Sequence, residues 1–284
     1  MAKIAAELTQ AVAHRALHGG PGSPTTRLLA KGQGWTVEDV ICTSGPGDRA
    51  YEERHSRVSI AVVAAGTFQY RSQRGRELMT PGSLMLGSPG QAFECGHEHA
   101  QGDRCLNFSY APEYWETLAE GAVFQTLRLP PLRELAPIVA KACSALTRPV
   151  AWEELSIELA AQTLQLATDV KNSTPNPAAE ARVTRIVRNI EQDPSAPNTL
   201  ATLASEACLS PYHFLRTFEQ VTGVTPHQFI LRARLREAAN RLSEPARIVD
   251  IALETGFGDL SNFNRTFRAE FGKSPRAWRS DPHS

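Results

Sequence analysis

The chain has 284 residues, of which 42% are hydrophobic and 21% charged, a globular composition with enough length for two domains. Thirty basic residues balance thirty acidic ones, so bulk charge gives no indication of a nucleic-acid partner. Because the sequence has no apolar run of about 18 residues, and segment 1–20 has no pure apolar core, we expect neither a membrane-spanning helix nor a signal peptide. We therefore expect a cytoplasmic protein without a membrane partner, whose five cysteines are reduced thiols.

The first part of the chain predicts a short helix followed by an antiparallel β-barrel or sandwich. Segment 1–20 carries Glu7 and Gln10 among apolar residues, as an amphipathic helix or arm does. Across residues 35–110, short apolar segments alternate with turn signals such as Pro81-Gly82 and Pro89-Gly90. Short strands with regular Gly and Pro turns are typical of barrels and sandwiches.

Helical periodicity begins near residue 132. Apolar residues recur at helical spacing over 132–146 and 152–167, with Pro149 between the two segments. The stretch "KNSTPNPAA" follows, and its Asn, Ser, Thr and Pro content predicts a linker. The expected parts are a barrel with an N-terminal arm over 1–130, a helical dimerisation segment over 131–171, a linker over 172–179 and an all-helical domain over 180–284.

The C-terminal region contains an internal repeat. "FLRTFEQVTGVTP" (214–226) returns as "FNRTFRAEFGKSP" (263–275), and the preceding segments 200–207 and 248–255 also match. Each copy predicts two helices joined by a tight turn, which is the helix-turn-helix unit whose second helix can lie in the DNA major groove. A helical solenoid or a plain helical bundle would share this pattern, although two copies are few for a repeat array.

Capping residues predict where the second helix of each copy begins and ends. Ser210 is the expected N-cap in the first copy and Asp259 in the second. Gly223 and Gly272 are expected at the C-termini. The segment 226–244 predicts a rigid connecting helix of roughly 28 Å, which could hold the two second helices about one DNA turn, roughly 34 Å, apart.

The side chains between the buried phenylalanines favour DNA binding. They offer donors to base edges and phosphates, in place of the Glu and Lys mixture of a merely solvated face. Arg216 and Arg265 occupy the same position in each copy, which indicates that both are used alike. The exposed set comprises Tyr212, His213, Arg216 and Thr217 in the first copy, and Ser261, Asn262, Asn264 and Arg265 in the second.

Residues 180–280 resemble the DNA-binding domain of the AraC/XylS family of bacterial transcription regulators, as "LATLASEACLSPYHFLRTFEQVTGVTPHQF" and "IVDIALETGFGDLSNFNRTFRAEFGKSPRAWR" follow that family's pattern. The resemblance implies a seven-helix domain that binds double-stranded operator or promoter DNA, a contact with RNA polymerase, and activation in preference to repression. Leu215 departs from the family, in which a polar residue often serves there, so it could touch a thymine methyl or face inward. The matching base-contacting positions are Tyr212, Leu215, Arg216, Ser261, Asn262 and Arg265.

The same resemblance implies a role for the front part of the chain. "MTPGSLMLGSPGQ" (79–91) is similar to the cupin-like barrel that often precedes the DNA-binding domain in this family. That barrel binds a small-molecule or metal effector or mediates homodimer formation. Enzymatic cupins bind metal through several histidines, of which only His55 remains here. We therefore expect a protein that is not an enzyme, with a cupin metalloenzyme fused to a DNA-binding domain as the alternative.

The stretch "ECGHEHAQGDRC" (94–105) predicts a metal site. On a strand, Cys95, His97 and His99 share a face, and Cys105 joins them if the intervening turn has an odd length. Two thiolates and two imidazoles suit Zn²⁺ or another transition metal. A thiol-redox switch formed by Cys95 and Cys105 and ordinary packing remain as alternatives.

Taken as a whole, the sequence predicts an α+β protein. An N-terminal cupin-like antiparallel β-barrel with flanking helices precedes a C-terminal all-α domain with two helix-turn-helix units. The remaining cysteines, Cys42, Cys143 and Cys208, have apolar neighbours in the sequence and are expected in cores. The expected function is sequence-specific transcriptional regulation, controlled by a signal that the N-terminal domain senses.

Overall fold

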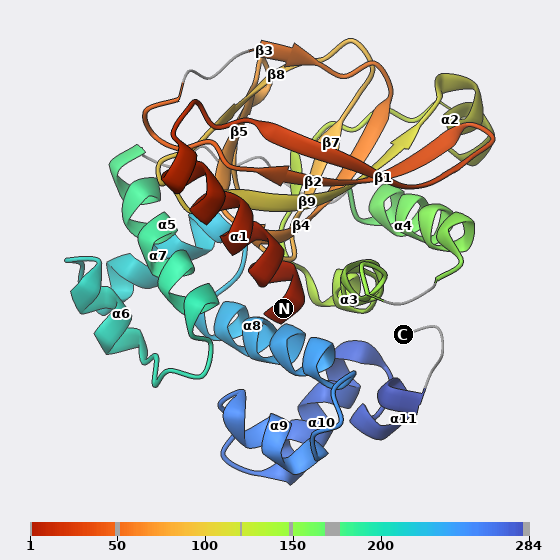
Figure 1. Cartoon of the computed structure of the whole chain (residues 1–284). Helices are drawn as coiled ribbons and strands as arrows, with labels where there is room; N and C mark the ends of the chain where they lie inside the picture. Colours follow the sequence, from red (N-terminus) through yellow and green to blue (C-terminus); the bar gives the residue numbers. More distant parts are fainter. Residues whose placement is uncertain (1, 49–51, 120, 148–149, 168–176, 281–284) are drawn as a thin grey trace. The chain divides into compact units, whose positions relative to one another are not determined.

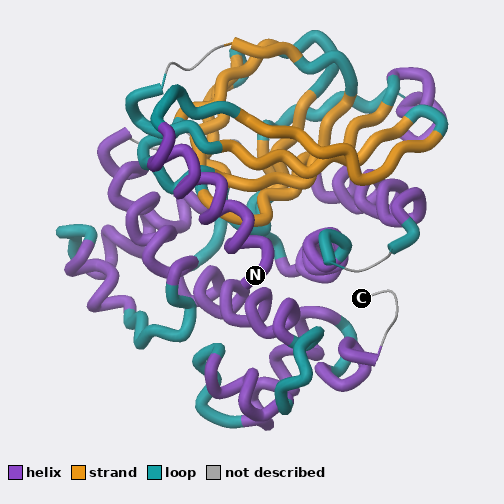
Figure 2. Tube along the Cα trace, viewed as in Figure 1, coloured by secondary structure: helices purple, strands orange, loops and turns teal. Residues whose placement is uncertain are grey.

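In a computed structural model the chain is described over residues 2–48, 52–119, 121–147, 150–167 and 177–280. They form two compact units. The sheet unit contains Ile4–Pro130 and Val150–Thr174, and the helical unit contains Met1–Lys3, Pro131–Pro149 and Pro175–Ser284. Strands dominate the first unit and helices the second (Figure 2), so the expected α+β class is confirmed. No helix of the described residues is both long and apolar enough to cross a membrane.

Two antiparallel sheets form the sheet unit (Figure 1). The larger sheet has the order β1-β2-β9-β4-β7-β10, and the smaller has the order β3-β8-β5-β6. Over the described residues the two sheets do not join into a closed ring, because β1 and β10 pair only within the larger sheet. The unit is therefore a two-sheet sandwich, one of the two forms that the pattern of short strands predicted. The strands are β1 Pro24–Gly32, β2 Trp35–Cys42, β3 Glu52–Arg54, β4 Val58–Gly66, β5 Phe68–Ser72, β6 Gly75–Met79, β7 Leu84–Gly87, β8 Ala92–Gly96, β9 Asp103–Tyr110 and β10 Arg128–Leu129.

The core of the sheet unit lies between the two sheets. β4 is the central strand of this core, and its β-branched and alanine residues are buried on both faces. Val63 of β4 and Cys105 of β9 pack with Tyr70 of β5 and Met79 of β6, so side chains from both sheets interdigitate.

Three helices belong to the sheet unit, α1 from its third residue onward: α1 Ala2–His18, α2 Pro112–Ala119 and α4 Trp152–Ala167. The expected N-terminal helix is α1, and Glu7 joins it to the larger sheet by accepting a 2.5 Å hydrogen bond from Arg104. Arg104 is fully buried and also donates to both carboxylate oxygens of Asp39, at 2.8 Å each. α4 is held to the end of β9, where the Tyr110 hydroxyl donates to the Ser156 carbonyl at 2.8 Å.

The expected helical segment 131–171 is split between the two units. Helix α3 belongs to the helical unit and packs on α8 and α10, whereas α4 belongs to the sheet unit. Residues 172–176 of the expected linker lie outside the described residues, and 177–179 form the start of α5. The helices of the helical unit are α3 Ala136–Ser144, α5 Pro177–Gln192, α6 Leu200–Glu206, α7 Pro211–Thr222, α8 Pro226–Arg241, α9 Ile248–Glu254, α10 Leu260–Phe271 and α11 Pro275–Ser280, preceded by a 3-10 turn, η1 Arg133–Leu135.

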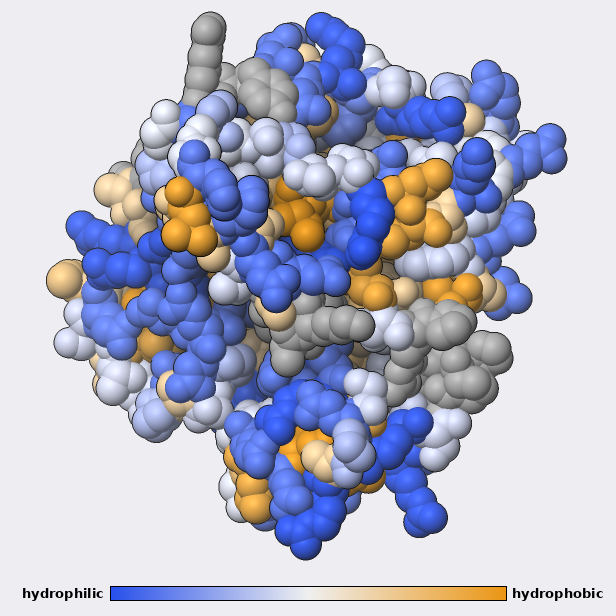
Figure 3. All heavy atoms as spheres, viewed as in Figure 1, coloured by the Kyte–Doolittle hydropathy of each residue, from blue (hydrophilic) through white to orange (hydrophobic). Residues whose placement is uncertain are grey.

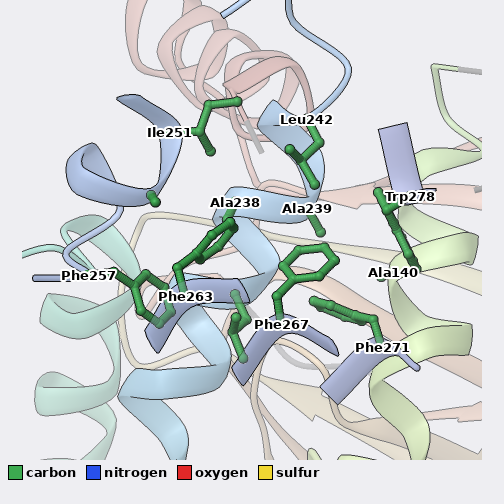
Figure 4. Close-up of a cluster of buried hydrophobic side chains, with 12 residues drawn as sticks. Ala140, Ala238, Ala239, Leu242, Ile251, Phe257, Phe263, Phe267, Phe271 and Trp278 are labelled. Atoms are coloured by element: carbon green, nitrogen blue, oxygen red, sulfur yellow. The ribbon is translucent and has the colours of Figure 1, made fainter. Parts of the chain in front are cut away.

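An aromatic cluster forms the core of the second half of this unit (Figure 4). Phe263 and Phe267 of α10 point toward Ala238 and Ala239 of α8. The two small alanines allow α10 to approach α8 closely. Trp278 of α11 closes the cluster, with its ring centroid 5.9 Å from that of Phe267.

Replacing Gly272 by alanine is expected to destabilise the helical unit by about 1–2 kcal/mol. Gly272 ends α10 at φ 72°, a left-handed conformation that costs an L-residue free energy even though a Cβ added there would have no atom within 4 Å. Urea unfolding followed by circular dichroism measures the change. Gly258→Ala is the matched control, because Gly258 is equally open but does not have a positive φ. Equal losses in both variants would contradict this explanation.

Candidate functional site

The first helix pair of the repeat is α6 and α7, and local hydrogen bonds set its bounds. The Ser210 hydroxyl accepts a hydrogen bond from the backbone N–H of His213 at 3.3 Å, so Ser210 is the N-cap of α7 as expected. Gly223 ends α7 at φ 79°, also as expected. In the turn between the helices, the Leu209 N–H donates to the Ala204 carbonyl at 3.0 Å.

The second pair, α9 and α10, repeats this geometry. Asp259 caps α10 by accepting from the Asn262 N–H at 2.7 Å, and the Phe257 N–H donates to the Ala252 carbonyl at 3.0 Å. Cys208 at φ 54° and Gly256 at φ 90° occupy corresponding positions in the two turns. The expectation that Cys208 is a core residue is therefore wrong: it is exposed, because the turn places it on the surface.

Both second helices bury one face and expose the other. Phe214 and Phe218 of α7 are fully buried, as are Phe263 and Phe267 of α10. The opposite faces are exposed and carry six of the seven predicted DNA-contacting residues, namely Tyr212, His213, Arg216, Ser261, Asn262 and Arg265.

Leu215 differs from the other predicted contacts. It is half-buried and lines a groove together with Leu203 of α6 and Ile230 of α8. Leu215 is therefore partly accessible, and both alternatives from the sequence, a thymine contact and packing, stay predictions.

Two of the exposed residues on α10 are coupled. The Arg265 guanidinium donates to the Asn262 side-chain oxygen at 3.1 Å, which orients both side chains on the same face. On α7, the His213 ring instead lies 2.9 Å from the Ser210 hydroxyl, so His213 contributes to the cap.

The sheet unit contains a cavity of about 380 Å³. Alternate residues of two paired strands line one wall, because side chains of a strand alternate between its faces. The opposite sheet contributes Phe68 of β5 together with Phe93 and Cys95 of β8. The strand residues of the first wall are Glu38, Val40 and Cys42 of β2 and Asp103, Cys105, Asn107 and Ser109 of β9.

The predicted metal ligands do not gather as the sequence spacing suggested. β8 ends at Gly96, so strand alternation does not extend to His97 and His99. His97 lies 2.7 Å from Asp103, whereas the Nε2 of buried His99 lies 2.7 Å from the Thr67 hydroxyl. Within the described residues, ligand atoms close enough to share an ion come from Cys42, His97 and Asp103, and His99 is not among them.

Comparison with known proteins relates both units to one group of proteins. Residues 38–164 match the AraC-like ligand binding domain, and residues 203–281 match a helix-turn-helix domain. The chain belongs to the AraC family of transcriptional regulators. As an AraC-family protein it is a DNA-binding regulator with an N-terminal ligand-binding domain.

Relatives of this AraC-family chain are named as transcriptional regulators. The uncharacterized HTH-type transcriptional regulator YbfI of Bacillus subtilis is 25% identical over 227 residues, which cover 73% of this chain and 79% of YbfI. The HTH-type transcriptional activator RhaS of Salmonella arizonae is 27% identical over 168 residues, which cover 59% of this chain and 57% of RhaS. A crystal structure of an AraC-type transcriptional regulator from Chromobacterium violaceum is 28% identical, covers 38% of this chain and 96% of its own, and gives a TM-score of 0.35.

Several arginines of the AraC-family helical unit hold the unit together. Arg234 of α8 donates to three carbonyl oxygens, those of Pro194, Ala196 and Gly256, at 2.7, 3.0 and 2.8 Å. Others form ion pairs, such as Arg232 with Glu270 at 3.1 Å. The abundance of arginine in this region is therefore not in itself a sign of DNA contacts.

The sequence pattern missed two exposed arginines beside Arg265. Arg268 of α10 and Arg276 of α11 line a shallow groove with Arg265. Figure 3 shows hydrophilic side chains over α9 and α10, in the lowest part of the view. The three-residue spacing from Arg265 to Arg268 places both on the same helix face, and this signal was present in the sequence.

The protonation of the cavity groups weakens the redox alternative. Burial raises the pKa of Cys95 and of Cys105, so both thiols stay protonated and are poor nucleophiles. Burial opposes the charge of His97, but its hydrogen bonds to Asp103 and Cys42 outweigh that effect and raise the pKa of His97 to about 10.

His55 is used in packing. Its ring stacks on Phe93 with centroids 4.2 Å apart, and its Nε2 lies 2.8 Å from the Tyr70 hydroxyl. Burial lowers the pKa of His55 from 6.5 to about 4, so the ring is neutral at pH 7.

Acid is expected to destabilise the sheet unit through His55. Its folded-state pKa lies below its unfolded value, so its contribution is complete above pH 6.5 and is lost as the pH falls toward 4, by about 3 kcal/mol. Urea unfolding at several pH values in this window, for the parent and His55→Gln, measures the effect. The variant is expected to be less stable at pH 7 but to lose less stability on acidification. Parallel pH profiles would contradict the assignment.

Proposed function

We propose that this AraC-family regulator reads operator or promoter DNA with α7 and α10 as recognition helices. The observation that carries the proposal is the pair of equally capped helices, whose buried phenylalanine faces leave Arg216 and Arg265 exposed at corresponding positions. α8 connects the two pairs, and its 16 residues, fewer than the 226–244 expected, give a rod of roughly 24 Å. With the turns that flank α8, this length is compatible with two successive major grooves, spaced about 34 Å apart.

The exposed side chains suggest distinct contacts within the groove. Arg216 and Arg265 can each donate two hydrogen bonds to a guanine edge, and Asn262 can pair with an adenine edge. Because Asn262 accepts from Arg265, the two are preorganised for neighbouring bases. We assign Tyr212 and Ser261 to bases or sugar-phosphate at the helix N-termini, His213 to the cap of α7, and Leu215 to packing.

The cavity is the proposed place of effector control. Its volume of about 380 Å³ lies in the range of small-molecule sites, and its lining combines apolar and ionisable side chains. We favour activation over repression, since the relative RhaS is named an activator. In this proposal the chain acts as a homodimer that recruits RNA polymerase. A non-enzymatic role is proposed in preference to a cupin metalloenzyme. Of the metal-binding histidines of enzymatic cupins only His55 remains here, and it is neutral and lies within hydrogen-bond distance of Tyr70.

Replacing Arg265 by alanine is expected to weaken specific operator binding by about 1–3 kcal/mol and to relax base preference in one half of the site. Arg216→Ala is expected to do the same in the other half. Selection of binding sites from random DNA followed by footprinting supplies the operator, and titration of each variant measures the loss.

Arg182→Ala is the matched control, because Arg182 is exposed on α5, a helix that belongs to neither helix pair of the repeat. It is expected to leave the affinity unchanged. If Arg216→Ala and Arg265→Ala bind the footprinted operator as tightly as the parent does, the recognition-helix assignment is wrong.

Arg268 is expected to contact phosphate. Arg268→Ala should weaken the binding of operator DNA and of unrelated DNA to a similar extent. It should also lower the steepness with which log affinity falls against log salt concentration by about 1. Binding titrations at several salt concentrations measure this slope. A loss confined to the operator would instead identify Arg268 as a base contact.

A further inference from the structure

A mixed set of metal-ligand side chains lies in the wall of the cavity. Cys42, His97 and Asp103 each offer one ligand atom, and these atoms all lie within 4.8 Å of one another. A thiol, an imidazole and a carboxylate thus converge from three separate chain segments. The sequence motif contained His97 but did not point to either of its neighbours as a ligand.

Strand pairing holds two members of this set in place. Cys42 of β2 and Asp103 of β9 are direct partners in the antiparallel register, so their side chains project from the same face. Asp103 is also the partner of Gly66 in β4, which fixes it from the other side. Its position is therefore set by backbone hydrogen bonding on both sides.

His97 reaches the set from the other sheet. It directly follows β8, and its Nε2 lies 2.7 Å from Asp103 Oδ2. The side chains of His97 and Asp103 are 5% and 7% exposed, so water reaches them poorly. Ligands from both sheets are preorganised around one point, as a metal site requires.

The ligand types select the class of ion. Zn²⁺ accepts thiolate, imidazole and carboxylate ligands, and three protein ligands leave a fourth position free for water or another ligand. A thiolate disfavours Mg²⁺ and Ca²⁺, which take oxygen ligands.

We infer that the cavity binds a single Zn²⁺-class ion through Cys42, His97 and Asp103, with the fourth coordination position open to the cavity. The inference rests on the proposed function, since the site lies in the domain assigned to effector control. As the ion binds, the Cys42 thiol releases its proton to solvent, and the His97 imidazolium, whose pKa is raised to about 10 in the metal-free protein, releases one as well, which frees a ring lone pair for coordination. The ion then offsets the charges of a buried thiolate and a buried carboxylate, and its open position can take a donor atom of an effector.

The competing explanation is a buried His97–Asp103 ion pair in which Cys42 is only a thiol hydrogen-bonded to His97. Such a pair needs no third partner and produces no thiolate–metal bond. The two explanations therefore differ in what Cys42 does when a metal is offered.

The test uses the full-length reduced protein, stripped of metal by a chelator and titrated with Co²⁺ as a spectroscopic substitute for Zn²⁺. We expect thiolate-to-cobalt charge-transfer absorption that saturates at one ion per chain and disappears when Zn²⁺ is added. Cys42→Ser should abolish this absorption. His97→Ala and Asp103→Asn should weaken Co²⁺ binding by about 100-fold or more, since changes even in the groups that support ligands cost 10–100-fold.

Two cysteine variants serve as matched controls. Cys105→Ser lies in the same cavity, two residues beyond Asp103 on β9, and Cys208→Ser is exposed in the helical unit. Both should retain the absorption. His99→Asn should retain it as well, because His99 is bonded to Thr67.

The inference is overturned if the parent shows no thiolate–cobalt absorption, if Cys42→Ser keeps it, or if Cys105→Ser or His99→Asn loses it. Circular dichroism of each metal-free variant verifies folding, and Cys42→Ser, which exchanges one atom, is the decisive variant. Operator binding is measured on the same samples. A protein that binds its operator but no Co²⁺ overturns the metal site alone, whereas one that binds Co²⁺ but no DNA overturns the proposed function alone.

Discussion

Aromatic packing against α8 is the constraint on which the proposed DNA-binding surface depends. Phe214 and Phe218 lie one turn apart on α7, and Phe263 and Phe267 repeat this on α10, with ring centroids 5.5 and 5.4 Å apart. Once these faces are buried, only the opposite face of each helix is available for polar contacts. α8 supplies Phe229 to the first cluster and two alanines to the second, so a single helix sets the orientation of both surfaces.

Strand register has the same role in the sheet unit. Cys42 faces the cavity because it pairs directly with Asp103, and a shift of one residue would exchange the inward and outward side chains of the shifted strand. The buried Arg104, which alternation turns to the other face of β9, donates to Asp39 of β2 and fixes that register electrostatically. The chemistry of the cavity is therefore a consequence of the pairing of β2 and β9.

The sequence predicted those features whose causes are local. The caps Ser210 and Asp259 and the terminal Gly272 act within one helical turn, so their roles could be predicted from neighbouring residues. Non-local pairing could not be predicted: Cys42 joins His97 only because two sheets stack. The helical segment 131–171 was predicted as one part, because an amphipathic pattern shows that a helix has an apolar face but does not identify the core that buries this face.

The positions of the arginines say more about DNA binding than the net charge of the chain does. A chain with no net charge binds a polyanion only if its cations are unevenly distributed. Arg232 and Arg234 are engaged with carboxylate or carbonyl oxygens inside the helical unit, so they add little to the field outside it. Arg216, Arg265 and Arg268 instead lie exposed on α7 and α10, where few acidic residues accompany them. The internal arginines thus hold the scaffold together, whereas the exposed arginines of α7 and α10 are available to an external anion.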